Sequence, residues 1–376
     1  MPPLDLTTLL VLAGMVVSLI AGEAAFYGDL LTLRINVAPP IVTAGFDGVM
    51  AEQTFVAESA RIVRGDSIIP TPTLRVNSRP TVVGALAAPL QLDTVVGALQ
   101  DQFGYDRVVV NGAVMSGAAG ALRILIVVEQ PRQTPEQIQL TQADGDPIAL
   151  VRRGADATMA RISPYRVAEA HYMQGIENND AQALKDARET ALDYMGRPWD
   201  PARASERAML YNLLAMLSLL DGQVVAAVNQ LALVDPIPGV LPQAQAVVAL
   251  NRAFLAVADK QPTQALAFLK AGEKLAVGNN AAWFNPKIIV LGGLVAWSAG
   301  DLAQAEKLFR AGIVARPTSE IPHIYLAQLL AARGDAAGAL AERNAAAASH
   351  PFDQEAPVFA QSIVWVDPVN GGIKPH

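Results

Sequence analysis

Residue types that commonly carry out catalysis are few in this chain, and their spacing does not suit it. The 376 residues include four histidines, His171, His323, His350 and His376, and no cysteine. No histidine has the i, i+4 partner or the neighbouring glutamate of a zinc site, and thiolate chemistry is excluded. The sequence also lacks a GxSxG elbow, a Walker loop and a dinucleotide fingerprint. We therefore expect no catalytic residue, metal or cofactor, and an enzyme with scattered catalytic residues is the alternative.

Two short motifs resemble ligand sites, but the residues around them favour turns. Segment 116–120 is rich in glycine, yet it lies between two strand-like runs and no GK[ST] follows, so we interpret it as a hairpin turn. Asp144 and Asp146 resemble the start of a calcium loop, but the later ligands of such a loop are absent. We interpret both aspartates as turn and N-cap residues.

The composition excludes some classes of partner. Hydrophobic residues make up 52% of the chain and charged residues 17%, with a net charge of −7. Its longest basic run is the pair Arg152-Arg153, whereas nucleic-acid binding requires clustered lysine and arginine. We therefore expect no nucleic-acid partner. The length predicts at least two folded units.

The N-terminal residues 1–28 are expected to form a membrane anchor. The segment from Leu6 to Gly22 is apolar and free of charge, and its roughly 17 residues are close to the minimum that spans a bilayer as a helix. A cleaved signal peptide is one alternative, although no basic residue precedes the apolar run. A soluble core helix is the other. We expect a single-pass protein of the bacterial inner membrane whose soluble domains lie in the periplasm.

Between the anchor and residue 162 the patterns predict a linker and a small α+β domain. Residues 29–44 contain Asn36-Val37-Ala38-Pro39-Pro40, which we interpret as an extended linker because proline restricts the backbone. Residues 45–162 form the expected domain. Its predicted helices are 48–64, 90–103 and 147–162, its predicted hairpin joins 106–115 to 121–129, and 68–83 and 137–141 are expected to be extended.

Residues 163–351 contain an internal repeat. The alanine step from Ala305 to Ala339, the Gly-Asp step from Gly300 to Gly334 and the proline step from Pro317 to Pro351 each span 34 residues. Looser copies lie upstream, with Ala227 and Ala265 at the matching alanine position, and residues 165–195 read as a further helix pair. Three markers with one spacing indicate stacked helix hairpins.

These markers resemble the tetratricopeptide-repeat (TPR) family. A small residue, a turn, an alanine, a large apolar residue and a late proline occur in the order that the family shows, although its usual tryptophan is missing. The order of anchor, Pro-Pro connector, α+β domain and repeats also looks like a group of membrane-anchored bacterial repeat proteins. The resemblance implies a C-terminal α-solenoid. The expected fold class is therefore mostly α, with an N-terminal transmembrane helix and a small α+β domain.

The resemblance also implies which residues line the concave side of the solenoid, since the second, fifth, ninth and twelfth repeat positions face inward. The candidate partner-binding groove is Met209, Met216, Leu250, Phe254, Val290, Leu294, Trp297, Ile324 and Gln328. The remaining inward positions are Asn212, Leu219, Val247, Val257, Lys287, Ile321 and Ala331. Because a misplaced register would make several of these residues core, that alternative stays open.

This wall is apolar, so something should cover it. A partner's apolar or helical segment is one candidate, and the chain's own tail, residues 352–376, is the other. We expect a membrane-anchored scaffold or assembly factor that binds proteins through its repeats. A permanent structural subunit of a larger membrane complex is the alternative.

Overall fold

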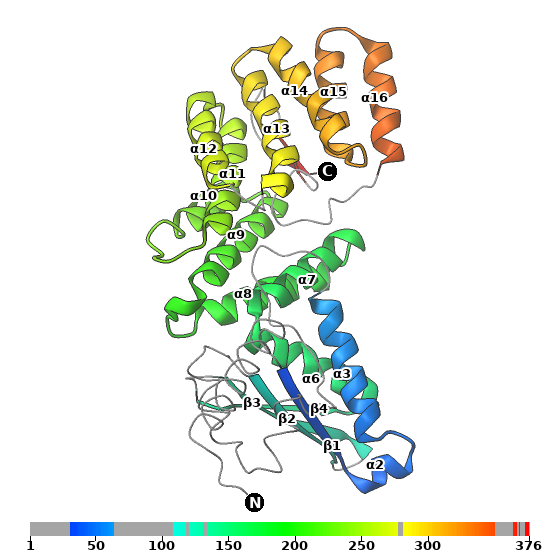
Figure 1. The fold of residues 1–376 in the computed structure, drawn as a ribbon. Coiled ribbons are helices and arrows are strands. Elements are labelled where there is room, and N and C mark those ends of the chain that lie inside the picture. Colours follow the sequence, from blue (N-terminus) through cyan, green and yellow to red (C-terminus); the bar gives the residue numbers. More distant parts are fainter. Residues whose placement is uncertain are drawn as a thin grey trace, which may run out of the picture. The chain divides into compact units, whose positions relative to one another are not determined.

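The computed structural model describes residues 31–63, 108–117, 120–130, 134–276 and 281–349, together with 364–366, 368 and 373–375 near the C-terminus. The chain divides into two compact units, with the main boundary between Ser163 and Pro164 (Figure 1). The boundary predicted from the sequence lies one residue earlier, between residues 162 and 163. Each unit is described by itself.

The first unit is a four-stranded sheet with two helices packed on it. The strands β1 (Leu31–Val37), β2 (Val108–Ser116), β3 (Leu122–Glu129) and β4 (Glu136–Gln142) lie in the order β1-β2-β3-β4. Strand β1 is parallel to β2, and the other neighbours are antiparallel. Helices α3 (Gly48–Ile62) and α6 (Pro147–Ile162) contact each other and the sheet. Alternate strand residues point to this covered face, as period-2 patterning requires, so Ile124 and Ile126 are fully buried.

The predicted hairpin, the third strand and the helices at 48–64 and 147–162 are confirmed. The extended linker is wrong, because residues 29–44 contain β1 and the short helix α2 (Pro39–Thr43). Leu31, Leu33, Ile35 and Val37 alternate with less apolar residues as in a strand. The two prolines begin α2, where a missing N–H costs nothing.

Three predictions fall on residues that the structure does not describe. They are the anchor at residues 1–28, the extended segment 68–83 and the helix 90–103. Within the described ranges, no helix combines the length and apolar character needed to cross a membrane.

The described part of residues 164–349 consists of five helix hairpins. They are α7 (Pro164–Glu177) with α8 (Ala181–Met195), α9 (Ala204–Leu220) with α10 (Val224–Ala232), α11 (Pro242–Ala258) with α12 (Pro262–Leu275), α13 (Ala281–Ser298) with α14 (Leu302–Ala315), and α15 (Glu320–Ala332) with α16 (Ala336–Ala348). Each first helix contacts its own second helix and the first helix of the next hairpin. Each second helix also contacts the following first helix. This arrangement is a stack of helix hairpins, as predicted.

All five hairpins turn in the same way. The second residue after each first helix adopts a left-handed conformation, with φ between +53° and +86°. The next backbone N–H then bonds to the carbonyl five residues earlier at 2.8–2.9 Å, which is the 6→1 bond of a Schellman motif. The left-handed residues are Asn179, Gly222, Lys260, Gly300 and Gly334. In the last two hairpins Asp301 and Asp335 then cap the second helix, as the Gly-Asp pattern predicts.

Small residues let the helices of each pair approach closely. The alanine of the repeat pattern is fully buried in all four matching second helices: Ala227, Ala265, Ala305 and Ala339. In α13, a Cβ added to Gly293 would lie 2.5 Å from the ring of Phe309 in α14. The first hairpin shows the same arrangement as α13 and α14, since Gly175 of α7 accommodates the larger Leu184 of α8.

Candidate protein-interaction surface of the helix hairpins

The structure places seven of the nine predicted groove residues in the buried hydrophobic core of the hairpin stack. These seven are Met209, Met216, Leu250, Phe254, Val290, Leu294 and Trp297. Ile324 is half-buried and Gln328 is exposed. Whether any of them contacts a partner stays a prediction, but only the two residues of α15 are accessible as the chain stands.

We call the sixteen predicted inward positions of α9, α11, α13 and α15 the inner wall. Every inner-wall position of α9, α11 and α13 is buried. On α15 Ile321 is buried, Ile324 is half-buried, and Gln328 and Ala331 are exposed. The inner-wall residues are therefore buried on three of the first helices and become exposed only toward the end of α15.

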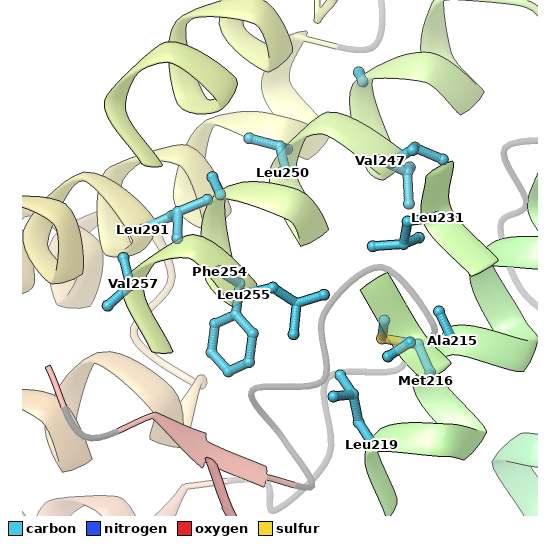
Figure 2. Packing of buried hydrophobic residues seen from close by; sticks show 14 of the residues in the cluster. Ala215, Met216, Leu219, Leu231, Val247, Leu250, Phe254, Leu255, Val257 and Leu291 are labelled. Carbon is cyan, nitrogen blue, oxygen red and sulfur yellow. The ribbon is translucent and has the colours of Figure 1, made fainter. Parts of the chain in front are cut away.

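The C-terminal tail comes near one of the three helices that carry the buried part of the inner wall. Strands β5 (Val364–Val366) and β6 (Ile373–Pro375) form an antiparallel hairpin, and β5 contacts α11. Figure 2 shows the same region, with a strand of the C-terminal hairpin on the side of Phe254 of α11. Own-chain backbone thus comes near α11, whose four inner-wall residues are all apolar.

One polar pair interrupts this apolar surface. The Asn251 amide on α11 donates a 2.7 Å hydrogen bond to the Asn212 side-chain oxygen on α9, and both residues are buried. The pair couples two successive hairpins through a bond that water cannot replace. Asn212 is one of the predicted inner-wall positions, whereas Asn251 is not. The repeat could have indicated Asn251, because it lies 39 residues after Asn212, close to the 38 residues that separate Ala227 from Ala265.

A second polar group lies at the start of the hairpin stack. Arg166 and Glu169 of α7 form a buried ion pair, and the Tyr165 hydroxyl donates a 2.7 Å hydrogen bond to Glu169. Burial raises the pKa of Glu169, while Arg166 and the Tyr165 hydroxyl oppose that rise. Burial, followed by the Glu169 charge, holds the pKa of Tyr165 well above its usual value. The backbone N–H of Tyr165 also donates a 3.2 Å hydrogen bond to Glu206, which joins the start of α7 to α9. None of these residues is among those predicted from the sequence.

At the open end, an aromatic cluster packs α15 against α13 and α14, and one carboxyl group is buried in its first turn. Phe309 of α14 packs edge-on to Trp297 and stacks on Tyr325, with ring centroids 6.2 Å and 5.8 Å away. Glu320, in the first turn of α15, is only 8% exposed, and its Oε1 has no hydrogen-bond partner in the described part of the chain. Burial raises the pKa of Glu320 from 4.5 to about 7.

No group of three or more histidine, aspartate and glutamate side chains could hold a metal ion within the residues that the structure describes. His323 lies 2.7 Å from Glu342, which joins α15 to α16.

Comparisons with known proteins add little to this geometry. No protein-family model and no curated protein matches the chain. A solved structure of Pseudomonas aeruginosa PilF is similar in part, with 16% sequence identity and a TM-score of 0.35, over 52% of this chain and 78% of that one. A likeness this distant supports no inference about function, so the interpretation of the site rests on the geometry of the chain itself.

Proposed function

We propose that this chain is a protein-interaction scaffold that binds its partner along the inner wall of degenerate tetratricopeptide repeats. The open end of that wall on α15 carries the proposal. There Ile324 and Gln328 are accessible beside the buried apolar surface of α13. A helix stack of this kind presents one helix face per repeat, so a partner can contact several hairpins at once.

The proposal includes a membrane tether through residues 1–28, with the soluble part in the bacterial periplasm. The apolar run from Leu6 to Gly22 supports the tether. Extraction of cell membranes with alkaline carbonate tests it, because a spanning helix keeps the chain in the pellet. Release of the full-length chain into the supernatant would refute the tether and leave the scaffold proposal intact.

The outer side of the stack supports a second candidate, a permanent subunit of a larger complex. Several large apolar residues on second helices are exposed, including Val225 of α10 at 76% and Val314 of α14 at 81%. Leu340 of α16 is also exposed. Exposed apolar side chains that form one contiguous patch are typical of surfaces that another protein covers, whereas single ones are common on any surface.

Purification of the intact chain in mild detergent, followed by quantitative mass spectrometry, distinguishes the two candidates. A scaffold should lose its companion when Ile324→Asp and Gln328→Lys are combined, and keep it with the control pair Val314→Lys and Leu340→Lys. A permanent subunit should keep its companion with the first pair of substitutions and lose it with the second. Retention of every companion by both pairs would refute both proposals.

A further inference from the structure

The sheet of the first unit has two edge strands, β1 and β4, and they differ in what covers their outer sides. Among the described strands, each has one neighbour. On β1, the Glu52 side chain of α3 accepts a 3.1 Å hydrogen bond from the backbone N–H of Ile35. A Cβ added to Gly48, the first residue of α3, would lie 2.9 Å from the Ile35 carbonyl oxygen. Helix α3 therefore occupies the outer side of β1 at Ile35, where a further strand would have to bond.

On β4, alternate residues direct their backbone groups away from the sheet. In the turn between β2 and β3, the Gly117 N–H donates a 2.7 Å hydrogen bond to the Ala121 carbonyl, so every second residue of β3 counted from Ala121 faces β2. The residues between them face β4, where their partners are the even-numbered residues. The odd-numbered residues Gln137, Gln139 and Thr141 therefore turn their N–H and C=O groups outward.

These outward residues of β4 are accessible. The side chains of Gln137, Gln139 and Thr141 are all exposed. Arg153 of α6 donates a 3.2 Å hydrogen bond to the Thr141 carbonyl, which agrees with the outward direction of that group, and a 2.7 Å bond to the Gln142 side-chain oxygen. The strand itself contains neither proline nor lysine, the residues that commonly protect an edge strand from pairing.

We propose that β4 pairs with β4 of a second copy of this chain, in an antiparallel register centred on Gln139. The seven residues EQIQLTQ then overlap completely. Gln139 lies opposite its counterpart in the second copy, Gln137 opposite Thr141, and Ile138 opposite Leu140. Outward backbone groups thus meet outward backbone groups, and the two apolar side chains meet on the face that α6 covers. The proposal concerns the first unit and does not rest on the function proposed for the helix hairpins.

The charges at the two ends of β4 favour the antiparallel register. Glu136 lies 3.3 Å from Arg161 at the start of the strand, and Gln142 holds Arg153 at its end. The antiparallel register places Glu136 of each copy opposite Gln142 of the other, so the carboxylate meets the Arg153 guanidinium. A parallel, in-register pairing would instead place Glu136 opposite its own counterpart, and like charges directly opposite each other are destabilising.

Arg153 changes its hydrogen-bond partner in this dimer. In the single chain its guanidinium satisfies the Thr141 carbonyl. In the dimer, the Gln137 N–H of the second copy donates to that carbonyl, and Arg153 is released toward the Glu136 carboxylate of the second copy. The edge is therefore satisfied in the single chain and still available for pairing.

The test measures the dimer fraction of the full chain in mild detergent by native mass spectrometry over a series of concentrations. Gln139→Lys and Gln139→Glu each place two like charges opposite each other and should weaken self-association by about fivefold. An equimolar mixture of the two variants should restore the original affinity, because lysine then lies opposite glutamate. The matched controls Asn36→Lys and Asn36→Glu add the same charges at an exposed position of β1 and should dimerise like the original chain.

Gln139→Pro is a second, stronger variant. It removes an outward N–H while leaving the hydrogen bonds to β3 in place, and it should abolish the dimer. If its circular dichroism spectrum shows a loss of folding, the mixture of the charged variants decides. A chain that is monomeric at every concentration, a dimer that neither charge affects, or a mixture that associates no better than its components would overturn the proposal. A foreign protein that copurifies with the monomeric chain and is lost with Gln139→Lys would also overturn it, and would assign the β4 edge to a strand of that protein.

Discussion

The shared turn of the five hairpins makes a quantitative prediction about Lys260. This residue has φ of +56°. Of the four matching turns in the described hairpins, three use glycine and one uses asparagine, which also tolerates this region, so Lys260 is the one long side chain among the five. A left-handed conformation costs a residue with a Cβ about 1–2 kcal/mol. Glycine removes this cost but lowers the free energy of unfolding by about 0.4–1 kcal/mol, because it raises the entropy of the unfolded chain. Lys260→Gly should therefore raise the free energy of unfolding by about 0.5–1 kcal/mol.

The opposite change should destabilise by a similar amount. Gly300 and Gly334 have φ of +86° and +81°, and nothing lies within 4 Å of a Cβ added at either position. The cost of Gly300→Ala is therefore conformational and not steric, about 0.5–1 kcal/mol. Gly196 is the matched control, since it ends α8 with φ of −73° and has room for a Cβ. Gly196→Ala should stabilise slightly, by about 0.4–1 kcal/mol.

Urea denaturation followed by circular dichroism measures all of these variants. The urea midpoint of Lys260→Gly should be higher than that of the original chain, and the midpoint of Gly300→Ala should be lower. The midpoint of Gly196→Ala should equal or exceed the original value. Identical midpoints for Gly300→Ala and Gly196→Ala would refute the assignment of a common left-handed turn to the hairpins.

Three further predictions concern the packing and charge of the stack. Gly293→Ala should lower the free energy of unfolding by about 1–3 kcal/mol because its Cβ meets the ring of Phe309, and additional Phe309→Leu should recover part of the loss in urea melts. Asn251→Ala should cost about 1–3 kcal/mol by leaving the buried Asn212 oxygen without its donor, and an unchanged thermal midpoint would contradict the coupling of α9 to α11. The folded chain holds the Glu320 proton more tightly than the unfolded chain, so its contribution to stability is present below pH 4.5 and is lost as the pH rises to about 7. Glu320→Gln should therefore be more stable than the original chain at pH 8, by at most about 3 kcal/mol, and as stable as the original chain at pH 4. A gain in stability at both pH values would contradict the pKa shift.

Local signals in the sequence predicted most of the helical half. Gly300-Asp301 and Gly334-Asp335 indicate a turn and an N-cap without any tertiary information, and the alanines mark where helices cross. Lys260 carries no such signal, because lysine rarely adopts the left-handed conformation that its turn imposes. The position of Lys260 between two regular helices could only be inferred from the repeat.

Predictions that depended on tertiary neighbours were less successful. The two prolines after β1 predict a linker there, whereas the pairing of β1 with β2, far along the chain, has no local signature. The inner wall was identified by position, but its exposure depends on which segments cover it. Sequence alone could not show that Phe254 is buried while Gln328 is exposed, because the exposure of each position depends on which neighbouring helices pack over it.

Site-specific photo-crosslinking in cells tests the central claim most directly, because it reports which face of the hairpin stack meets another protein. A photoreactive amino acid at Gln328 samples the open inner wall, and one at Val314 samples an exposed position on α14. The scaffold account predicts a discrete crosslinked protein from position 328 and none from position 314. Crosslinks from position 314 alone would contradict it and assign the outer surface as the interface.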